Sequence, residues 1–97
     1  YSGRVTHIHF EIYRTLVAAA TTGASAVKTS QLTYDRATLT AFYAAAGSVY
    51  GNSAANHASS SPATDNVFSD GYSTQLATLT GSVANGYTST LTVGIAA

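Results

Sequence analysis

The segment from Val5 to Tyr13 constrains the fold more than any other part of this chain. Its sequence, Val-Thr-His-Ile-His-Phe-Glu-Ile-Tyr, alternates with a period of two. Because successive side chains of a β-strand project to opposite faces, this alternation predicts a strand with one apolar and one polar face. The apolar face carries Ile8, Phe10 and Ile12, and the polar face carries His7, His9 and Glu11.

A β-hairpin is predicted near the end of the chain. The segments Leu76–Val83 and Tyr87–Ile95 flank Asn85 and Gly86, and the second of them alternates between apolar and small polar residues. Asn-Gly is a strong hairpin signal, since both residues tolerate the positive φ of a type I′ turn. We therefore expect two antiparallel strands that meet at Asn85 and Gly86.

One short helix and a second short strand are predicted in the middle of the chain. Residues Gln31 to Tyr34 favour a strand, and Asp35 is a suitable N-cap for a helix that ends before Gly47. The apolar face of this helix follows a spacing of i, i+3, i+4 and i+7. It consists of Leu39, Phe42, Tyr43 and Ala46.

Two stretches are expected to be irregular. Thr15–Val27 is interpreted as a strand end that runs into a loop, and Ser48–Ala63, which holds the only proline, as a flexible loop with a solvated His57. The scattered acids Glu11, Asp35, Asp65 and Asp70 are interpreted as turn, cap and rim residues. No paired carboxylates, phosphate-binding glycine loop or Ser/His/Asp set is visible.

Composition narrows the class of protein. More than half of the 97 residues are Ala, Ser, Thr or Gly, so the core is thin for an independent fold. Only 8% are charged and the net charge is zero, which argues against nucleic-acid or lipid partners and leaves little repulsion against self-association. No apolar run reaches the roughly 18 residues of a membrane span. The absence of cysteine excludes disulfides and thiolate metal sites, and the Ser/Thr/Ala/Gly richness is common in secreted microbial proteins.

The polar face of the first strand carries a candidate metal site. His7 and His9 lie two residues apart, so both imidazoles project to one side at a separation that allows them to share an ion. Tyr1 adds a phenol, whose phenolate is a hard donor that favours Fe(III), and Arg4 adds a guanidinium. The alternative is two hydrogen-bonding histidines on a polar surface.

The opening nine residues, Tyr-Ser-Gly-Arg-Val-Thr-His-Ile-His, resemble the Y-x-G-R-x-x-H-I-H signature of the intradiol ring-cleavage dioxygenases, particularly their secreted fungal and bacterial branch. Further similarity is found at Ser30–Asp35, at Thr64–Ser69 and at Leu91–Ile95. The resemblance covers essentially all 97 residues, but only the C-terminal part of the family fold. It implies an all-β, mainly antiparallel β-sandwich with one short helix, of which residues 1–97 form a part.

The resemblance also implies roles for individual residues. Tyr1, His7 and His9 match iron ligands of a non-haem Fe(III) centre that holds two tyrosinates and two histidines. Arg4 resembles the arginine that stabilises negative charge on the ring during attack by oxygen, and Gln31 resembles a glutamine beside it in the substrate pocket. The partners are then a small aromatic diol, O2 and the upstream segment that supplies the first tyrosine.

The remaining tyrosines match no ligand position of the family and are expected to be core or surface aromatics: Tyr13, Tyr34, Tyr43, Tyr50, Tyr72 and Tyr87.

Two functions from different classes follow. The first is the C-terminal portion of a secreted intradiol dioxygenase, which cleaves catechol-type diols with O2 between the two hydroxyl-bearing carbons. The second is an inactive β-rich fragment that assembles into homo-oligomers or filaments through uncovered strand edges. A third hypothesis is that the chain is a small carbohydrate-binding or adhesion module, which only the tyrosine content supports.

Overall fold

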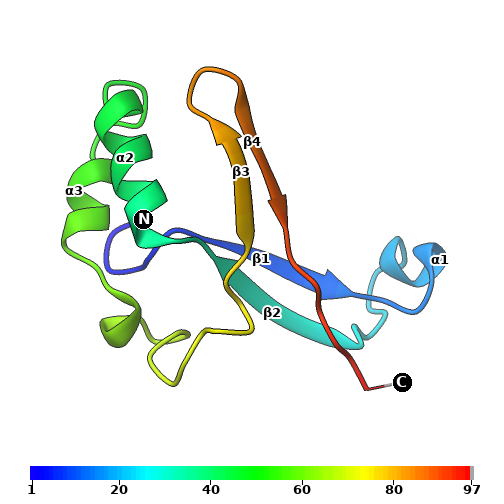
Figure 1. Cartoon of the computed structure of the whole chain (residues 1–97). Helices are drawn as coiled ribbons and strands as arrows, with labels where there is room; N and C mark the ends of the chain where they lie inside the picture. The colour runs from blue at the N-terminus through cyan, green and yellow to red at the C-terminus, as the bar shows by residue number, and fades with distance from the viewer. Residues whose placement is uncertain (97) are drawn as a thin grey trace.

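The computed structural model describes residues 1–96 as two small antiparallel sheets with helices beside them (Figure 1). The strands β1 (His7–Ile12) and β2 (Lys28–Thr33) form the first sheet. The strands β3 (Thr78–Ser82) and β4 (Gly86–Thr90) form the second, which stands as a hairpin beside the helices in Figure 1. A parallel bridge between Thr33 and Leu76 links β2 to the segment before β3.

The predicted first strand is confirmed as β1, and its pairing defines the two faces. His7 lies opposite Thr33 and His9 opposite Gln31, whereas Ile8 lies opposite Leu32. Directly opposed residues of an antiparallel pair share a face, so the histidines and Gln31 lie on one side and the apolar residues of β1 on the other. The apolar face is incompletely covered, since Ile8 is 50% exposed. The second strand is displaced from the predicted range and ends before Tyr34.

The hairpin is confirmed, with shorter arms and a different turn. Its strands stop at Ser82 and Thr90, and residues 91 to 96 are not in a strand. Ser82 pairs with Gly86, so the loop consists of residues 83 to 85, and of Asn85 and Gly86 only Gly86 has a positive φ, of 83°. A type I′ turn would require positive φ at Asn85 as well. The three-residue connection keeps Asn85 in an ordinary conformation.

The central helix is confirmed as α2 (Arg36–Ala46), with Asp35 as its N-cap and Gly47 as its C-cap. The Asp35 carboxylate accepts a hydrogen bond from the backbone N–H of Thr38 at 2.9 Å, which satisfies one of the free donors at the helix start. This bond and a second from the Thr38 hydroxyl lower the pKa of Asp35.

Both stretches expected to be irregular contain helices. A single turn, α1 (Leu16–Ala19), has Thr15 as its N-cap, and the Thr15 hydroxyl accepts a hydrogen bond from the backbone N–H of Ala18. The predicted Ser48–Ala63 loop holds α3 (Ser53–Ala58) and a 3₁₀ turn, η1 (Pro62–Thr64). Alanines in α3 have high intrinsic helix propensity, which outweighs the Ser and Asn content that favoured a loop.

The hydrophobic core of the described residues is small and the molecule is extended. The buried apolar residues are Val5, Leu39, Phe68 and Ala77. The radius of gyration is 15.3 Å, against about 12.5 Å for a compact domain of this length. The elements therefore leave much of their apolar surface uncovered.

The fold is mixed rather than all-β. Helices and strands involve comparable numbers of residues, and the strands form two separate pairs instead of a clear sandwich. The expectation of antiparallel pairing holds, but that of a single helix does not. No helix among residues 1–96 has the length and apolar character required to cross a membrane.

Candidate functional site

The first feature of the site is a pair of hydrogen bonds that fixes Arg4. Its Nε donates to Oδ2 of Asp65 at 2.7 Å, and its Nη2 donates to Oε1 of Gln31 at 2.6 Å. The structure thus brings together Arg4 and Gln31, which are 27 residues apart in sequence. With two of its nitrogens held by separate oxygens, the guanidinium is restricted in position and orientation.

Asp65 is the buried anchor of this arrangement. Only 1% of the residue is exposed, and its carboxylate also accepts hydrogen bonds from the backbone N–H groups of Val5, Val67 and Phe68. Burial alone would raise its pKa, but the bonds from Arg4 and from the three backbone groups outweigh that effect and lower the pKa to about 2. Asp65 therefore remains ionised at neutral pH. Its bonds to Val67 and Phe68 fit the turn and cap roles expected of the acids, but its burial excludes a rim position.

The two histidines lie side by side as predicted. Their ring centroids are 5.1 Å apart, and neither histidine is among the buried residues. Nδ1 of His7 is 2.7 Å from the carbonyl oxygen of Val5. Because a carbonyl only accepts, Nδ1 carries the proton, and a neutral His7 then presents Nε2 with a free lone pair. A hydrogen bond of this kind orients metal-ligating histidines.

Tyr1 lies beside His7 because the chain turns back between them. The backbone N–H of Arg4 bonds to the carbonyl of Tyr1 at 3.4 Å, and Gly3 has a φ of 78°, as the third residue of a type II turn requires. The ring of Tyr1 is edge-on to that of His7 at 6.2 Å between centroids. Tyr1 is 85% exposed, so this turn and ring contact are its main restraints.

The donor set decides which metal chemistry the site allows. Among residues 1–96 no group of three or more His, Cys, Asp or Glu side chains is placed to hold a metal ion. The ring of Tyr1 lies beside His7, so its phenol is a candidate third protein donor for a metal bound by His7 and His9. Two imidazole nitrogens and one phenolate oxygen form a set that suits ferric iron.

Gln31 joins the arginine to the histidine pair. It lies directly opposite His9 in the β1–β2 ladder, so its side chain is on the histidine face. Its backbone carbonyl accepts a hydrogen bond from Nε2 of Gln75 at 2.9 Å, and that nitrogen also approaches the Ser30 hydroxyl. The five residues singled out from the sequence thus belong to one side of the first sheet and the turn before it: Tyr1, Arg4, His7, His9 and Gln31.

Sequence reasoning missed Asp65 and Gln75. Asp65 is 61 residues from Arg4, and no local pattern shows that an acid in a loop will receive an arginine. The only sequence feature that pointed to Asp65 was the similarity of Thr64–Ser69 to a turn region of the family. That similarity did not indicate that Asp65 is buried.

His57 is a buried structural residue and not the solvated loop histidine that was expected. It is 6% exposed, and its Nε2 is 2.7 Å from the Thr40 hydroxyl on α2. Arg36 donates from Nη2 to the backbone carbonyl of His57 at 2.9 Å. Burial, and then the positive charge of Arg36, lower the pKa of His57. Its contacts join α3 to α2.

Comparisons with known proteins found no relative of this chain. A scan against protein-family models, a search of curated proteins and a search of solved structures each found no match to this chain.

Proposed function

We propose that this chain forms the C-terminal part of a secreted, non-haem Fe(III) intradiol dioxygenase, with Tyr1, His7 and His9 as iron ligands. The observation that carries the proposal is the hydrogen bond between Arg4 and Gln31 on the face that bears the two histidines. The resemblance names these same residues, since the opening nine-residue signature contains Arg4, His7 and His9 and the similar segment Ser30–Asp35 contains Gln31. Their proximity requires a sheet register that neither segment specifies by itself.

The residues fit the proposed metal. The bond from His7 Nδ1 to the Val5 carbonyl leaves Nε2 of His7 for coordination. The phenol of Tyr1, whose ring lies edge-on to His7, supplies the oxygen donor. A bound ferric ion would supply Lewis-acid activation of the two diol oxygens of the substrate. The first tyrosinate of the family centre would come from a segment outside these 97 residues, and the complete domain would be a β-sandwich.

Arg4 and Gln31 would act on the substrate ring. Addition of O2 to a diol ring develops negative charge on ring atoms, and a fixed guanidinium stabilises that charge. Asp65 binds Nε of the guanidinium, whereas Gln31 binds Nη2, so reorientation of Arg4 during the reaction is restricted. The overall reaction is balanced, because both oxygen atoms of O2 enter a muconate-type diacid and the bond between the two hydroxyl-bearing carbons breaks.

A spectroscopic experiment tests the ligand assignment. The chain is mixed with excess ferric iron, and the visible charge-transfer band of tyrosinate bound to Fe(III) is recorded for the wild type, Tyr1→Phe and His7→Ala. We expect a band in the wild type that both substitutions remove. Tyr50→Phe is the matched control, because Tyr50 is also exposed but packs near Phe42 on α2. A band that survives in Tyr1→Phe, or no band in the wild type, would contradict the assignment.

Self-assembly is a second candidate function, and the exposed surface of the chain supports it. The outer edges of β1 and β4 have no strand partner among residues 1–96, and Ile8, Leu16 and Val17 are at least half exposed. Uncovered strand edges with low charge favour pairing between copies. Negative-stain microscopy and light scattering of the purified chain test this candidate, and dispersed particles of about the 9.9 kDa chain mass would rule it out.

A further inference from the structure

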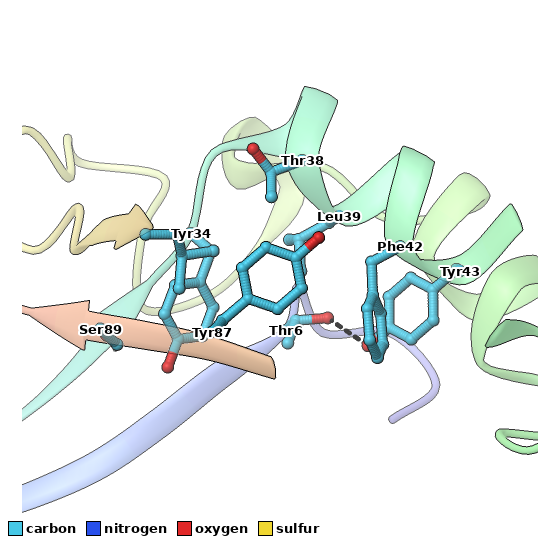
Figure 2. Close-up of a pocket in the computed structure, with 9 residues that line it drawn as sticks. Thr6, Tyr34, Thr38, Leu39, Phe42, Tyr43, Tyr87 and Ser89 are labelled. Carbon is cyan, nitrogen blue, oxygen red and sulfur yellow. Dashed lines mark hydrogen bonds between the residues drawn. The ribbon is translucent and has the colours of Figure 1, made fainter. Parts of the chain in front are cut away.

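A second site lies between α2 and the β3–β4 hairpin. It is a cavity of about 240 Å³ whose walls come from α2, from the residues that flank one end of the β1–β2 sheet (Thr6 before β1 and Tyr34 after β2) and from the hairpin (Figure 2). None of the five residues of the candidate iron site lines it. Its lining residues are Thr6, Tyr34, Thr38, Leu39, Phe42, Tyr43, Leu79, Tyr87 and Ser89.

Aromatic rings dominate the walls of the cavity. Phe42 meets Tyr87 across the gap between α2 and β4, with ring centroids 6.1 Å apart and planes at 74°, and it contacts Tyr43 edge-on at 5.3 Å. In Figure 2 Tyr87 extends from β4 toward α2, with Tyr34 next to it. Rings in these orientations offer both faces and edges, which are the partners that a further aromatic ring prefers.

The volume sets the size of the ligand. An apolar cavity of about 150 Å³ is large enough to bind benzene, whereas pockets for drug-sized molecules start at about 300 Å³. A cavity of about 240 Å³ is therefore large enough for one substituted ring.

The polar groups set the chemistry of the ligand. No lining residue carries a formal charge at neutral pH, so an ionised ligand would lose its hydration without a counter-charge. The Thr6 hydroxyl is bonded to the Tyr43 hydroxyl at 2.9 Å, and the Thr38 hydroxyl donates to Asp35. Among residues 1–96 the hydroxyls of Tyr34, Tyr87 and Ser89 have no protein partner, which leaves a few groups that could bond a ligand hydroxyl.

A sugar fits these features less well than a phenol. A monosaccharide buries several hydroxyls, and each one left without a hydrogen-bond partner weakens binding because its hydration is lost. A phenol has one hydroxyl to satisfy, and its ring matches the aromatic walls. We propose that this cavity is a binding site for a neutral, single-ring phenol, separate from the candidate iron site and independent of whether iron binds.

The test uses the ¹⁵N-labelled 97-residue chain, kept free of iron with a chelator, so that coordination of phenol by iron contributes nothing. Phenol is titrated and the amide chemical shifts are followed. Cyclohexanol serves as the non-aromatic ligand of matched size, and glucose as the sugar. We expect saturable shifts at residues 38 to 43, at Tyr34 and at residues 87 to 89, with phenol bound more tightly than either alternative.

Two variants of β4 localise the binding. Ser89 is exposed apart from its place in the cavity wall, so Ser89→Phe should fold normally and fill the cavity, which weakens phenol binding by at least about tenfold. Thr88→Phe makes the same change one residue earlier, on the opposite face of the strand, and should leave binding unchanged. The dispersion of the spectra without ligand verifies that both variants fold.

Four results would overturn the proposal. They are the absence of saturable shifts in the wild type, shifts confined to the region of His7 and His9, equal phenol binding by Ser89→Phe and the wild type, and binding of cyclohexanol or glucose as tight as that of phenol. Failure of the iron experiment would leave this result unaffected, because the titration contains no metal.

Discussion

The side chain of Arg4 is joined to the buried carboxylate of Asp65 by a 2.7 Å ion pair that spans 61 positions of the sequence. This contact ties the segment before β1 to the loop after η1, and it leaves Nη2 of the guanidinium directed at Gln31. Loss of Asp65 would therefore affect both the stability of the fold and the position of Arg4.

Asp65→Asn should destabilise the chain. The substitution keeps the size of the side chain but removes the charge that Arg4 pairs with, and removal of one member of a buried pair is strongly destabilising. Because Arg4 retains some contact with solvent, we expect a loss of about 2–3 kcal/mol in the free energy of unfolding, measured with urea. Asp70→Asn, at an exposed acid, is the control and should change little. Equal stability of the two variants would contradict a structural role for the ion pair.

Acid should unfold the chain in a range set by Asp65. The pKa of this group is lowered in the folded state, so the unfolded state binds a proton first as the pH falls. The stabilisation, about 2 kcal/mol for a shift of this size, is complete above about pH 5 and is lost as the pH falls from about 4 to 2. Circular dichroism during an acid titration of wild type and Asp65→Asn measures it, and the variant should show a smaller loss over this range.

The buried His57 should cause a second loss of stability at higher pH. Its pKa is lowered by burial and by Arg36, so the unfolded state is protonated more readily as the pH falls below about 6.5. We expect a lower urea midpoint at pH 5 than at pH 7. His57→Gln should reduce this difference, whereas His9→Gln, at an exposed histidine, should retain it. A difference that is unchanged in His57→Gln would assign the effect to another group.

The 97-residue chain as a monomer should not retain iron tightly. Three donors from Tyr1, His7 and His9 leave roughly half of an octahedral sphere without protein ligands. Loss of a residue that only hydrogen-bonds to a metal ligand weakens metal binding by about 10- to 100-fold, and loss of a phenolate ligand should weaken it further. Metal analysis after dialysis against citrate should therefore find less than stoichiometric iron. Stoichiometric ferric iron on the monomer would show that three donors suffice.

Gly81→Ala should disrupt the hairpin. Gly81 has a φ of 125°, and a Cβ there would collide with the carbonyl oxygen of Gly86 on the paired strand. Strain at such positions costs about 1–3 kcal/mol, and the collision adds to it. Amide exchange in β3 and β4 should accelerate. Gly94→Ala is the control, since a Cβ at Gly94 meets no atom within 4 Å. Unchanged exchange in Gly81→Ala would show that β3 adjusts without loss of pairing.

Local patterns in the sequence were enough to predict β1 and α2. The alternation around His7 and His9 sets which side each residue takes along an extended backbone, and the cap at Asp35 with its apolar spacing fixes the start and face of α2. The hairpin was predicted for the same reason, although Gly86 alone adopts the conformation expected of both Asn85 and Gly86.

The placement of Asp65 and His57 depended on tertiary structure. The residues around them give no period or spacing that distinguishes a buried partner from a loop residue, because burial results from contacts with Arg4 and with Thr40 that are distant in sequence. The proximity of Arg4, Gln31 and the histidines was expected only through family resemblance, and physically it depends on the register that sets His9 opposite Gln31. Sequence periodicity determines which way a side chain points, whereas the pairing of distant segments determines what it meets.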